Sequence, residues 1–501
     1  MEIQFREKPC EFLRRIVHET AQQEETADVI VPDSFPDVAR IVCCSASVIV
    51  RSKECRTGSV TLSGGIRACA VYVPEDGSQP RALDQYIPFS LRTDHPALSE
   101  QTQCVTDCFV RSADARMLNS RKVMFRVNLG CITDGYEPQS EAFYEPVETP
   151  PALQLKRQSF PLLLPAATGE RSFPISETLT LPAGKPPIAQ LLCWDSEAYV
   201  EDRKIVGNKA VFKGNLYVRL LYLTQDERPE TAQIPVPFSQ YCELESDCAD
   251  QDLQLRLLHT GAQLEPEAES GRELILLVQL LAQCVVSRVE TVQTVEDAFA
   301  VGQTLDADWK ICRLNARLDR QTLRLPIRQS IETDAAAIVD STIYPDFAQV
   351  SHQGSTAAIR VPLTVNLLCY DSENELQGIT VRAEAVGETA LAAQAQCDVR
   401  PQILPEGYAI AAGNSVELRY EADADVSTYA EQELRTLSEA SLLPPEDEQP
   451  CRPSVVLFTN RERRSVWDIA KQYGADVGTV SAVNGLDGDS AEEGKILLIP
   501  M

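Results

Sequence analysis

Apolar and polar side chains alternate with a period of two along most of the chain. Residues 216–222 place apolar side chains at every second position, and residues 123–129 do the same. This period puts alternate side chains on one face of a strand. Turn-forming residues at 74–78 and 226–229 separate such runs. The pattern predicts a mainly β protein made of tandem sandwich-like or barrel-like β repeats.

The longest apolar run extends from Leu274 to Val286 and is interrupted by Gln279 and Gln283. It is too short to cross a bilayer as a helix, which takes about 20 residues. We therefore expect a buried strand in this region.

The chain contains an internal repeat. Residues 29–50 align without a gap on residues 179–200, 150 positions later. The same offset matches identical residues, among them Pro32 and Pro182, Pro36 and Pro186, Cys43 and Cys193, Gly64 and Gly214, and Tyr72 and Tyr222. An Ile/Val-Pro-Phe-Ser element recurs at 87–90 and 236–239, and residues 133–136 are matched with 296–299. These matches predict a duplicated β domain.

A third, degenerate copy is predicted downstream, because residues 365–371 resemble residues 218–223. It is followed by a segment rich in proline and acidic residues, a composition typical of an extended linker. The sequence thus predicts five parts, namely repeats at 1–148, 149–305 and 306–442, a linker at 443–453 and a separate domain at 454–501.

The C-terminal segment predicts the order strand, helix, helix, strand (βααβ), with strands at 455–458 and 496–500. The two helices are expected to end at Tyr473 and Val483. The helix starts are predicted from capping residues, namely Ser465 with Asp468 for the first helix and Asp476 for the second. The helix ends are predicted from residues that favour a left-handed conformation, Gly474 and Asn484-Gly485. The segment is a small α+β domain.

This segment resembles the LysM domain through residues 465–470, 473–474, 480–486 and 494–500. The resemblance implies binding of N-acetylglucosamine glycans such as peptidoglycan through two loops, at 460–466 and 484–494. The residues that it implicates in binding are Arg461, Arg463, Arg464, Ser465, Asn484, Gly485 and Leu486. LysM domains commonly have Gly-Asp before the helix cap, whereas this chain has Arg463-Arg464, which argues against glycan binding by the first loop.

The β repeats resemble the SPOCS domain of endospore-forming bacteria, through Pro32-Asp33, Pro36-Asp37 and the Ile-Pro-Phe-Ser element. SPOCS repeats followed by one terminal LysM domain are similar to morphogenetic proteins of the spore coat. The resemblance implies a protein of the mother-cell cytoplasm, at the forespore surface, that takes part in coat assembly. Its LysM domain would bind a SpoIVA-like ATPase of the coat basement.

Charge favours a protein partner over the other classes. The 501 residues include 74 acidic and 46 basic ones, for a net charge of −28, which disfavours nucleic acid and anionic membranes as general partners. The first residues are charged and no apolar stretch follows them, so we expect no secretory signal and no contact with wall glycan. Arg461, Arg463 and Arg464 form a basic group that suits carboxylates on a partner, or else a solvated loop. Trp467 is expected to pack in the domain core.

The 16 cysteines and four histidines do not indicate a metal site. There is no Cys-x-x-Cys pair, and no histidine lies near paired cysteines. We expect reduced, buried thiols, and neither a metal nor a cofactor.

Three functional hypotheses remain. The first is a non-catalytic structural and interaction protein of spore-coat assembly, and the second is a peptidoglycan-binding protein. The third is an enzyme. The sequence lacks the common nucleophile, phosphate-loop and zinc-protease motifs, which argues against catalysis and leaves paired carboxylates as the one open chemistry.

Overall fold

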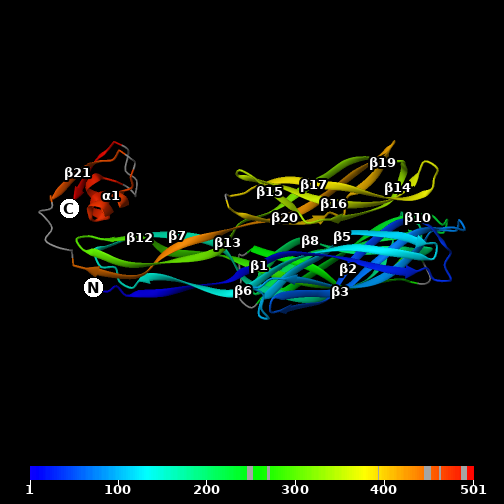
Figure 1. Ribbon diagram of the computed structural model, residues 1–501, viewed down its shortest axis with the longest axis horizontal. Helices are drawn as coiled ribbons and strands as arrows, with labels where there is room; N and C mark the ends of the chain where they lie inside the picture. The colour runs from blue at the N-terminus through cyan, green and yellow to red at the C-terminus, as the bar shows by residue number, and fades with distance from the viewer. Residues whose placement is uncertain (245–251, 268–270, 393, 445–452, 462–463, 487–493) are drawn as a thin grey trace.

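The computed structural model describes residues 1–501 apart from 245–251, 268–270, 393, 445–452, 462–463 and 487–493. Strands dominate it, which confirms the mainly β prediction. Three β-sandwiches gather at one end of an elongated molecule, and long strands extend from them as a stalk (Figure 1). The C-terminal helices lie at the tip of the stalk, near the N-terminus.

The first repeat is a sandwich of two three-stranded antiparallel sheets, ordered β1-β6-β5 and β2-β3-β4. Its strands are β1 (Phe5–Ile30), β2 (Val38–Arg56), β3 (Ser59–Pro74), β4 (Arg81–Asp94), β5 (Gln103–Asn119) and β6 (Lys122–Pro146). Every second side chain of β4 from Ile87 to Thr93 is buried, as expected of a strand with one face on the core. Phe125, Tyr72 and Ile66 fill the space between the sheets.

The second repeat has the same plan, with the strand orders β11-β12-β7 and β10-β9-β8. The first of these sheets continues into the third repeat through a single residue pair, Leu163 with Arg317. Its strands are β7 (Leu153–Thr180), β8 (Gln190–Val206), β9 (Lys209–Leu223), β10 (Pro229–Glu243), β11 (Asp252–Pro266) and β12 (Glu273–Ala300). The apolar run from Leu274 to Val286 lies in β12, so the prediction of a buried strand is confirmed.

The third repeat keeps this plan with two of its strands split. Its strands are β13 (Thr304–Glu332), β14 (Ala335–Pro345), β15 (Gln349–Gln353), β16 (Thr356–Asp371), β17 (Leu376–Ala390), β18 (Gln396–Ile403), β19 (Tyr408–Ala412) and β20 (Ser415–Leu443). Both β14 and β15 pair with β16, and both β18 and β19 pair with β20. In the third repeat β14 and β15 occupy the position that β2 fills in the first repeat, and β18 and β19 occupy the position that β5 fills.

Equivalent residues of the first two repeats make equivalent contacts. The hydroxyl of Tyr72 donates to the carbonyl of Pro36 at 3.1 Å, and that of Tyr222 donates to Pro186 at 3.0 Å. A Cβ on Gly64 would lie 2.0 Å from the Ile49 carbonyl oxygen, and Gly214 is equally close to a strand backbone. These contacts explain why tyrosine and glycine recur at positions 150 residues apart in the two repeats.

One element of the alignment is wrong. Ile30 and Thr180 are equivalent at the 150-residue offset, and they pair with Lys122 of β6 and Glu273 of β12, respectively. Lys122 and Glu273 are therefore the equivalent residues of these two strands. Asp134 then lies in the middle of β6, whereas Asp297 lies near the end of β12. Residues 133–136 and 296–299 share a similar composition but occupy different positions in the fold.

The first and last strands of each repeat pair with each other beyond the sandwich. The pairs are β1 with β6, β7 with β12, and β13 with β20, in strands of 25 to 29 residues. Each first strand has a register shift where the sandwich ends, at residues 16, 166 and 318. Such bulges bend a strand and increase its twist. Beyond them the three ribbons form the stalk.

The stalk has its own hydrophobic core, to which all three ribbons contribute. Near the sandwiches it contains Phe12 of β1, Leu164 of β7 and Leu314 of β13, and near the tip Ile3, Leu153 and Leu437. Because the repeats share this core, the division of the chain at residues 148, 305 and 442 stays a prediction. The predicted linker lies mostly outside the described residues.

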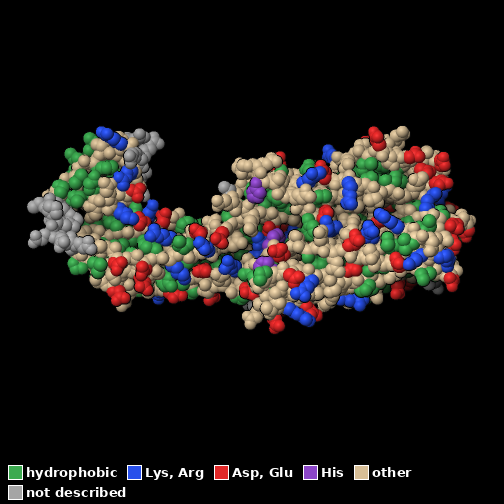
Figure 2. All heavy atoms as spheres, viewed as in Figure 1, with side chains coloured by type: hydrophobic (Ala, Val, Ile, Leu, Met, Phe, Trp, Pro, Cys, Tyr) green, Lys and Arg blue, Asp and Glu red, His purple; other side chains and the backbone are tan. Residues whose placement is uncertain are grey.

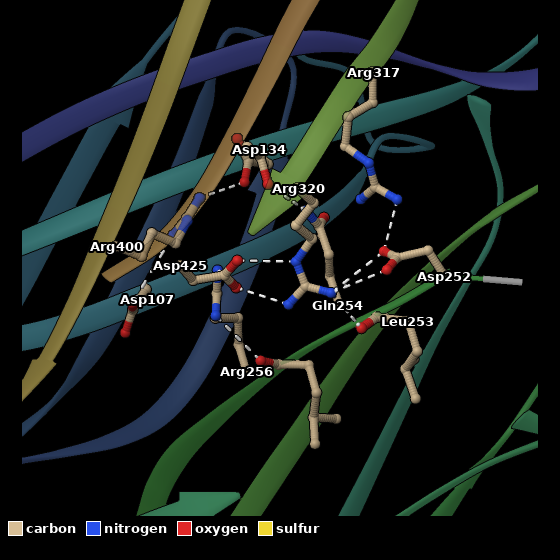
Figure 3. A network of polar contacts seen from close by, with 12 residues as sticks. Asp107, Asp134, Asp252, Leu253, Gln254, Arg256, Arg317, Arg320, Arg400 and Asp425 are labelled. Carbon is tan, nitrogen blue, oxygen red and sulfur yellow. Dashed lines mark hydrogen bonds and ion pairs between the residues drawn. The ribbon is translucent and has the colours of Figure 1, made fainter. Parts of the chain in front are cut away.

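Buried ion pairs join the repeats where the stalk meets the sandwiches (Figure 3). Asp134 of the first repeat contacts Arg400 of the third. Asp425 of the third accepts from Arg256 of the second at 3.0 Å and from Arg320 at 2.9 Å. Burial alone would raise the pKa of Asp425, but Arg256 and Arg320 reverse this and hold it well below its usual range. The ionised carboxylate therefore stabilises the packing of the repeats.

The expectation of reduced thiols is wrong for one pair. Cys69 of β3 and Cys193 of β8 form a disulfide across the contact between the first two repeats. Twelve other cysteines in the described part of the chain are free. Pairing partners on strands 124 residues apart cannot be deduced from the sequence.

Asp425→Asn tests the contribution of the ion pairs. We expect the free energy of unfolding to fall by about 3 kcal/mol at pH 7, because two buried arginines lose a charged partner. Since the folded pKa is depressed, the wild type keeps this advantage above about pH 4 and loses it as the pH falls further. Urea unfolding between pH 3 and pH 7 measures both effects. Asp94→Asn, whose exposed carboxylate pairs with Arg92, is the control and should change stability by less than about 0.5 kcal/mol.

Candidate functional site

The C-terminal domain has the predicted order of elements. It consists of β21 (Val455–Thr459), α1 (Val466–Tyr473), α2 (Val477–Asn484) and β22 (Ile496–Pro500), and β21 pairs antiparallel with β22. The predicted capping residues are confirmed. Ser465 accepts from the Asp468 backbone N–H at 3.0 Å, and Asp476 accepts from that of Thr479 at 2.7 Å. Gly474 and Gly485 end the helices with φ of 62° and 60°.

Trp467 is buried, as expected, but its partners lie partly outside the domain. Its ring packs edge-on against Phe299 of β12, with centroids 4.9 Å apart. Its indole N–H donates to a carboxylate oxygen of Asp297 at 2.9 Å, and Lys471 contacts the same carboxylate at 2.6 Å. Although burial opposes it, the hydrogen bonds from Lys471 and Trp467 lower the pKa of Asp297. The domain therefore docks on the stalk tip through α1.

The arginines of the first loop differ in their surroundings. Arg461 is exposed, and Arg463 lies outside the described residues. Arg464 is half-buried, and its guanidinium donates to the Gln472 side chain at 2.5 Å. Its backbone N–H donates to the side chain of Asn460 at 2.9 Å. Of the described arginines in this loop, Arg461 is therefore the more accessible to a partner.

Asn460 is a structural residue of this loop that the sequence analysis missed. It is fully buried. Its side-chain amide donates to the Arg464 carbonyl at 3.0 Å, and its backbone N–H donates to the Lys495 carbonyl at 3.0 Å. It thus connects the first loop to the start of β22. An asparagine directly after a strand was the available signal, since its side chain readily bonds nearby backbone.

The other implicated residues serve the fold. Ser465 is the cap of α1, and its hydroxyl also donates to Asp468 at 2.8 Å. The Asn484 amide donates to the Leu498 carbonyl at 2.6 Å and accepts from the Leu498 N–H at 2.7 Å, which ties α2 to β22. Leu486 packs against the domain core and Gly485 is exposed. The structure brings Asn484, Gly485 and Leu486 together at the end of α2, but whether any of them binds a ligand stays a prediction.

An apolar surface faces away from the helices. Val456, Phe458, Leu497 and Ile499 point toward the helices, whereas the alternate side chains point outward. The outward residues are Val455, Leu457, Ile496 and Leu498, with exposed fractions of 49, 70, 62 and 40%. Figure 2 shows hydrophobic side chains gathered over β21. We call these four residues the outer apolar face. The sequence contained the signal, because neither strand alternates with polar residues.

A cavity of about 920 Å³ lies where the three sandwiches meet. Asp195 and Glu197 of β8 line it, two positions apart on the same face of the strand. Glu197 is exposed to the space of this cavity, and loss of solvation there together with the neighbouring Asp195 raises the pKa of its carboxyl. A carboxyl with a raised pKa is one of the properties that an enzyme using paired carboxylates would need. Among the described residues no cluster of His, Cys, Asp or Glu suits a metal ion.

Comparison with known families identifies two domains in the chain. Residues 187–260 match the family described as SipL, SPOCS domain, and residues 465–500 match the LysM domain. The first match covers β8 to β10 and most of β11 in the second repeat. No curated protein and no solved structure matches the chain. The resemblance to a SipL-like protein is thereby confirmed, and both domains are non-catalytic binding domains.

Within the described part of the chain, no helix is long and apolar enough to cross a membrane. The SPOCS match supports a role connected with sporulation, and the LysM match supports binding of a protein or a glycan.

Asp297→Ala tests the docking of the LysM domain. The variant removes the partner of both Trp467 and Lys471, so we expect docking to weaken by about 2 kcal/mol, the scale of hydrogen bonds to a charged group. Hydrogen–deuterium exchange at the end of β12 should then be roughly tenfold faster or more. The neighbouring Glu296→Ala is the control, since Glu296 is exposed and pairs only weakly with Lys156 at 3.6 Å. Equal exchange in both variants would mean that Asp297 does not hold the domain.

Proposed function

We propose that the protein is a non-catalytic structural and interaction protein of spore-coat assembly. Its LysM domain binds a SpoIVA-like coat ATPase in the mother-cell cytoplasm, at the forespore surface. The observation that carries this proposal is a LysM domain held at the tip of a stalk, with the side chains of its outer apolar face 40 to 70% exposed. The SPOCS match supports the sporulation setting.

The chemistry of the outer apolar face favours a protein over a sugar. Burying one leucine side chain against a partner contributes about 1.5–3 kcal/mol, and four adjacent apolar side chains can form the apolar centre of an interface. Arg461 lies in the loop that follows β21 and is exposed. It can pair with a carboxylate at the rim, where charges mainly affect association rate and specificity.

Glycan binding is the second candidate, supported by the LysM match. A sugar needs hydrogen-bonding groups that are free to meet its hydroxyls. The side chains of Ser465 and Asn484 already bond Asp468 and Leu498. This leaves backbone groups and arginines as the main polar contacts in the described part of the loops.

We also propose a role for the β repeats, which is to carry the LysM domain at a fixed distance from the sandwiches. Three ribbons with a shared core make a stiff support, whereas a single ribbon is marginally stable. In this proposal the sandwiches are free to contact other coat components.

A binding assay with the full-length chain separates the hypotheses. Biosensor titrations would use a SpoIVA-like protein, and pull-downs would use purified peptidoglycan. Leu457→Glu should weaken protein binding by about tenfold to a hundredfold, because a charge replaces the most exposed leucine of the apolar face. Arg461→Glu should weaken it less and mainly at low salt.

Val289→Glu is the matched control, since this exposed valine lies on the stalk and its replacement should leave binding unchanged. Retention on peptidoglycan alone would favour the glycan hypothesis. Equal losses in Leu457→Glu and Val289→Glu would contradict the assignment of the apolar face.

A further inference from the structure

Two free thiols of the first sandwich lie close enough to react with each other. The sulfur atoms of Cys55 and Cys104 are 3.6 Å apart. Cys55 belongs to β2 and Cys104 to β5, which are in different sheets of the sandwich. A bond between them would therefore join the two sheets at the end of the sandwich that faces the stalk.

The two thiols differ in access. Cys55 is half-buried, whereas only 7% of Cys104 is exposed. Burial, with a contribution from Cys55, raises the pKa of the Cys104 thiol to about 12. A thiol attacks a disulfide as the thiolate and only where the reagent can reach it. An external reagent therefore meets Cys55 first.

The surroundings of Cys104 place the pair beside the second repeat. Lys53 donates to the Cys104 carbonyl at 2.5 Å and to the Gln283 side chain at 2.9 Å. Gln283 in turn donates to the Thr106 carbonyl at 2.8 Å and accepts from the Thr106 N–H at 3.1 Å. Through these contacts β12 holds the edge of β5. A change in the position of Cys104 therefore alters the contact between the first and second repeats.

We propose that Cys55 and Cys104 are a disulfide-forming site that reacts with a small-molecule disulfide such as oxidised glutathione. The Cys55 thiolate attacks one sulfur of the reagent, forming a mixed disulfide and releasing one glutathione thiolate. Cys104 then attacks the Cys55 sulfur, and the second glutathione leaves. The two thiol protons end on the two released glutathiones, so two cysteines are oxidised and one glutathione disulfide is reduced to two thiols.

The close approach of the sulfurs makes the second step intramolecular, which raises its rate strongly. Together with Cys69–Cys193, which joins the first two repeats, the new bond fixes the first sandwich both internally and to its neighbour. Oxidation then stiffens the contact between repeats without requiring a change of fold.

Peptide mapping of the full-length protein tests the proposal. The chain is reduced, freed of reductant, exposed to oxidised glutathione and digested with trypsin. We expect peptide 54–56 linked to peptide 93–111, which contains both Cys104 and Cys108. Cys108→Ser should keep the link and Cys104→Ser should lose it. In Cys104→Ser, Cys55 should instead carry one glutathionyl group, the trapped intermediate.

A second measurement follows the effect on the fold. Hydrogen–deuterium exchange of residues 103–110 should slow by about tenfold on oxidation in the wild type and not in Cys104→Ser. Recovery of the Cys69–Cys193 link in each variant shows that the variant folds. Wild-type protein that stops at glutathionylated Cys55, or a link that survives in Cys104→Ser, would overturn the proposal.

Discussion

The structure depends on one constraint, which is that the first and last strands of each repeat pair with each other over their whole length. This pairing brings the two ends of a repeat to one place and leaves the middle strands to fold back as a sandwich. Because the paired strands continue beyond the bulges, three repeats in series also produce three ribbons that can share a core. The register shifts at residues 16, 166 and 318 mark the change from sandwich to stalk.

Side-by-side sandwiches expose strand edges to one another, and polar side chains satisfy those edges. Gln283 of the second repeat bonds both backbone groups of Thr106 in the first. Asn366 of the third repeat donates to the carbonyls of Cys44 and Ala113, each at 3.1 Å. A buried amide needs such partners, since an unpaired polar group costs free energy. Gln283, which interrupts the apolar run of β12, therefore makes a specific contact between repeats.

The local features of the fold could be predicted from the sequence, and the long-range ones could not. Period-two alternation indicated the strands, and Ser465, Gly474 and Asp476 indicated the helix boundaries, because these depend on neighbouring residues. The stalk depends on which strands pair beyond the sandwich, and the Cys69–Cys193 bond depends on how two repeats pack. The match of residues 133–136 with 296–299 failed because composition alone does not determine register. The outer apolar face could be predicted from its pattern, because both β21 and β22 carry apolar side chains at successive positions and therefore on both faces of the sheet.

The position of the LysM domain determines which of its surfaces can meet a partner. Docking on the stalk uses α1, through Trp467 and Lys471 against Asp297. The outer apolar face lies on the other side of the two-stranded sheet, since the inward side chains of that sheet pack toward the helices. Docking and binding through this face therefore do not compete for the same atoms. A partner can bind while the LysM domain stays docked. Binding then costs less conformational entropy than binding to a freely moving LysM domain would.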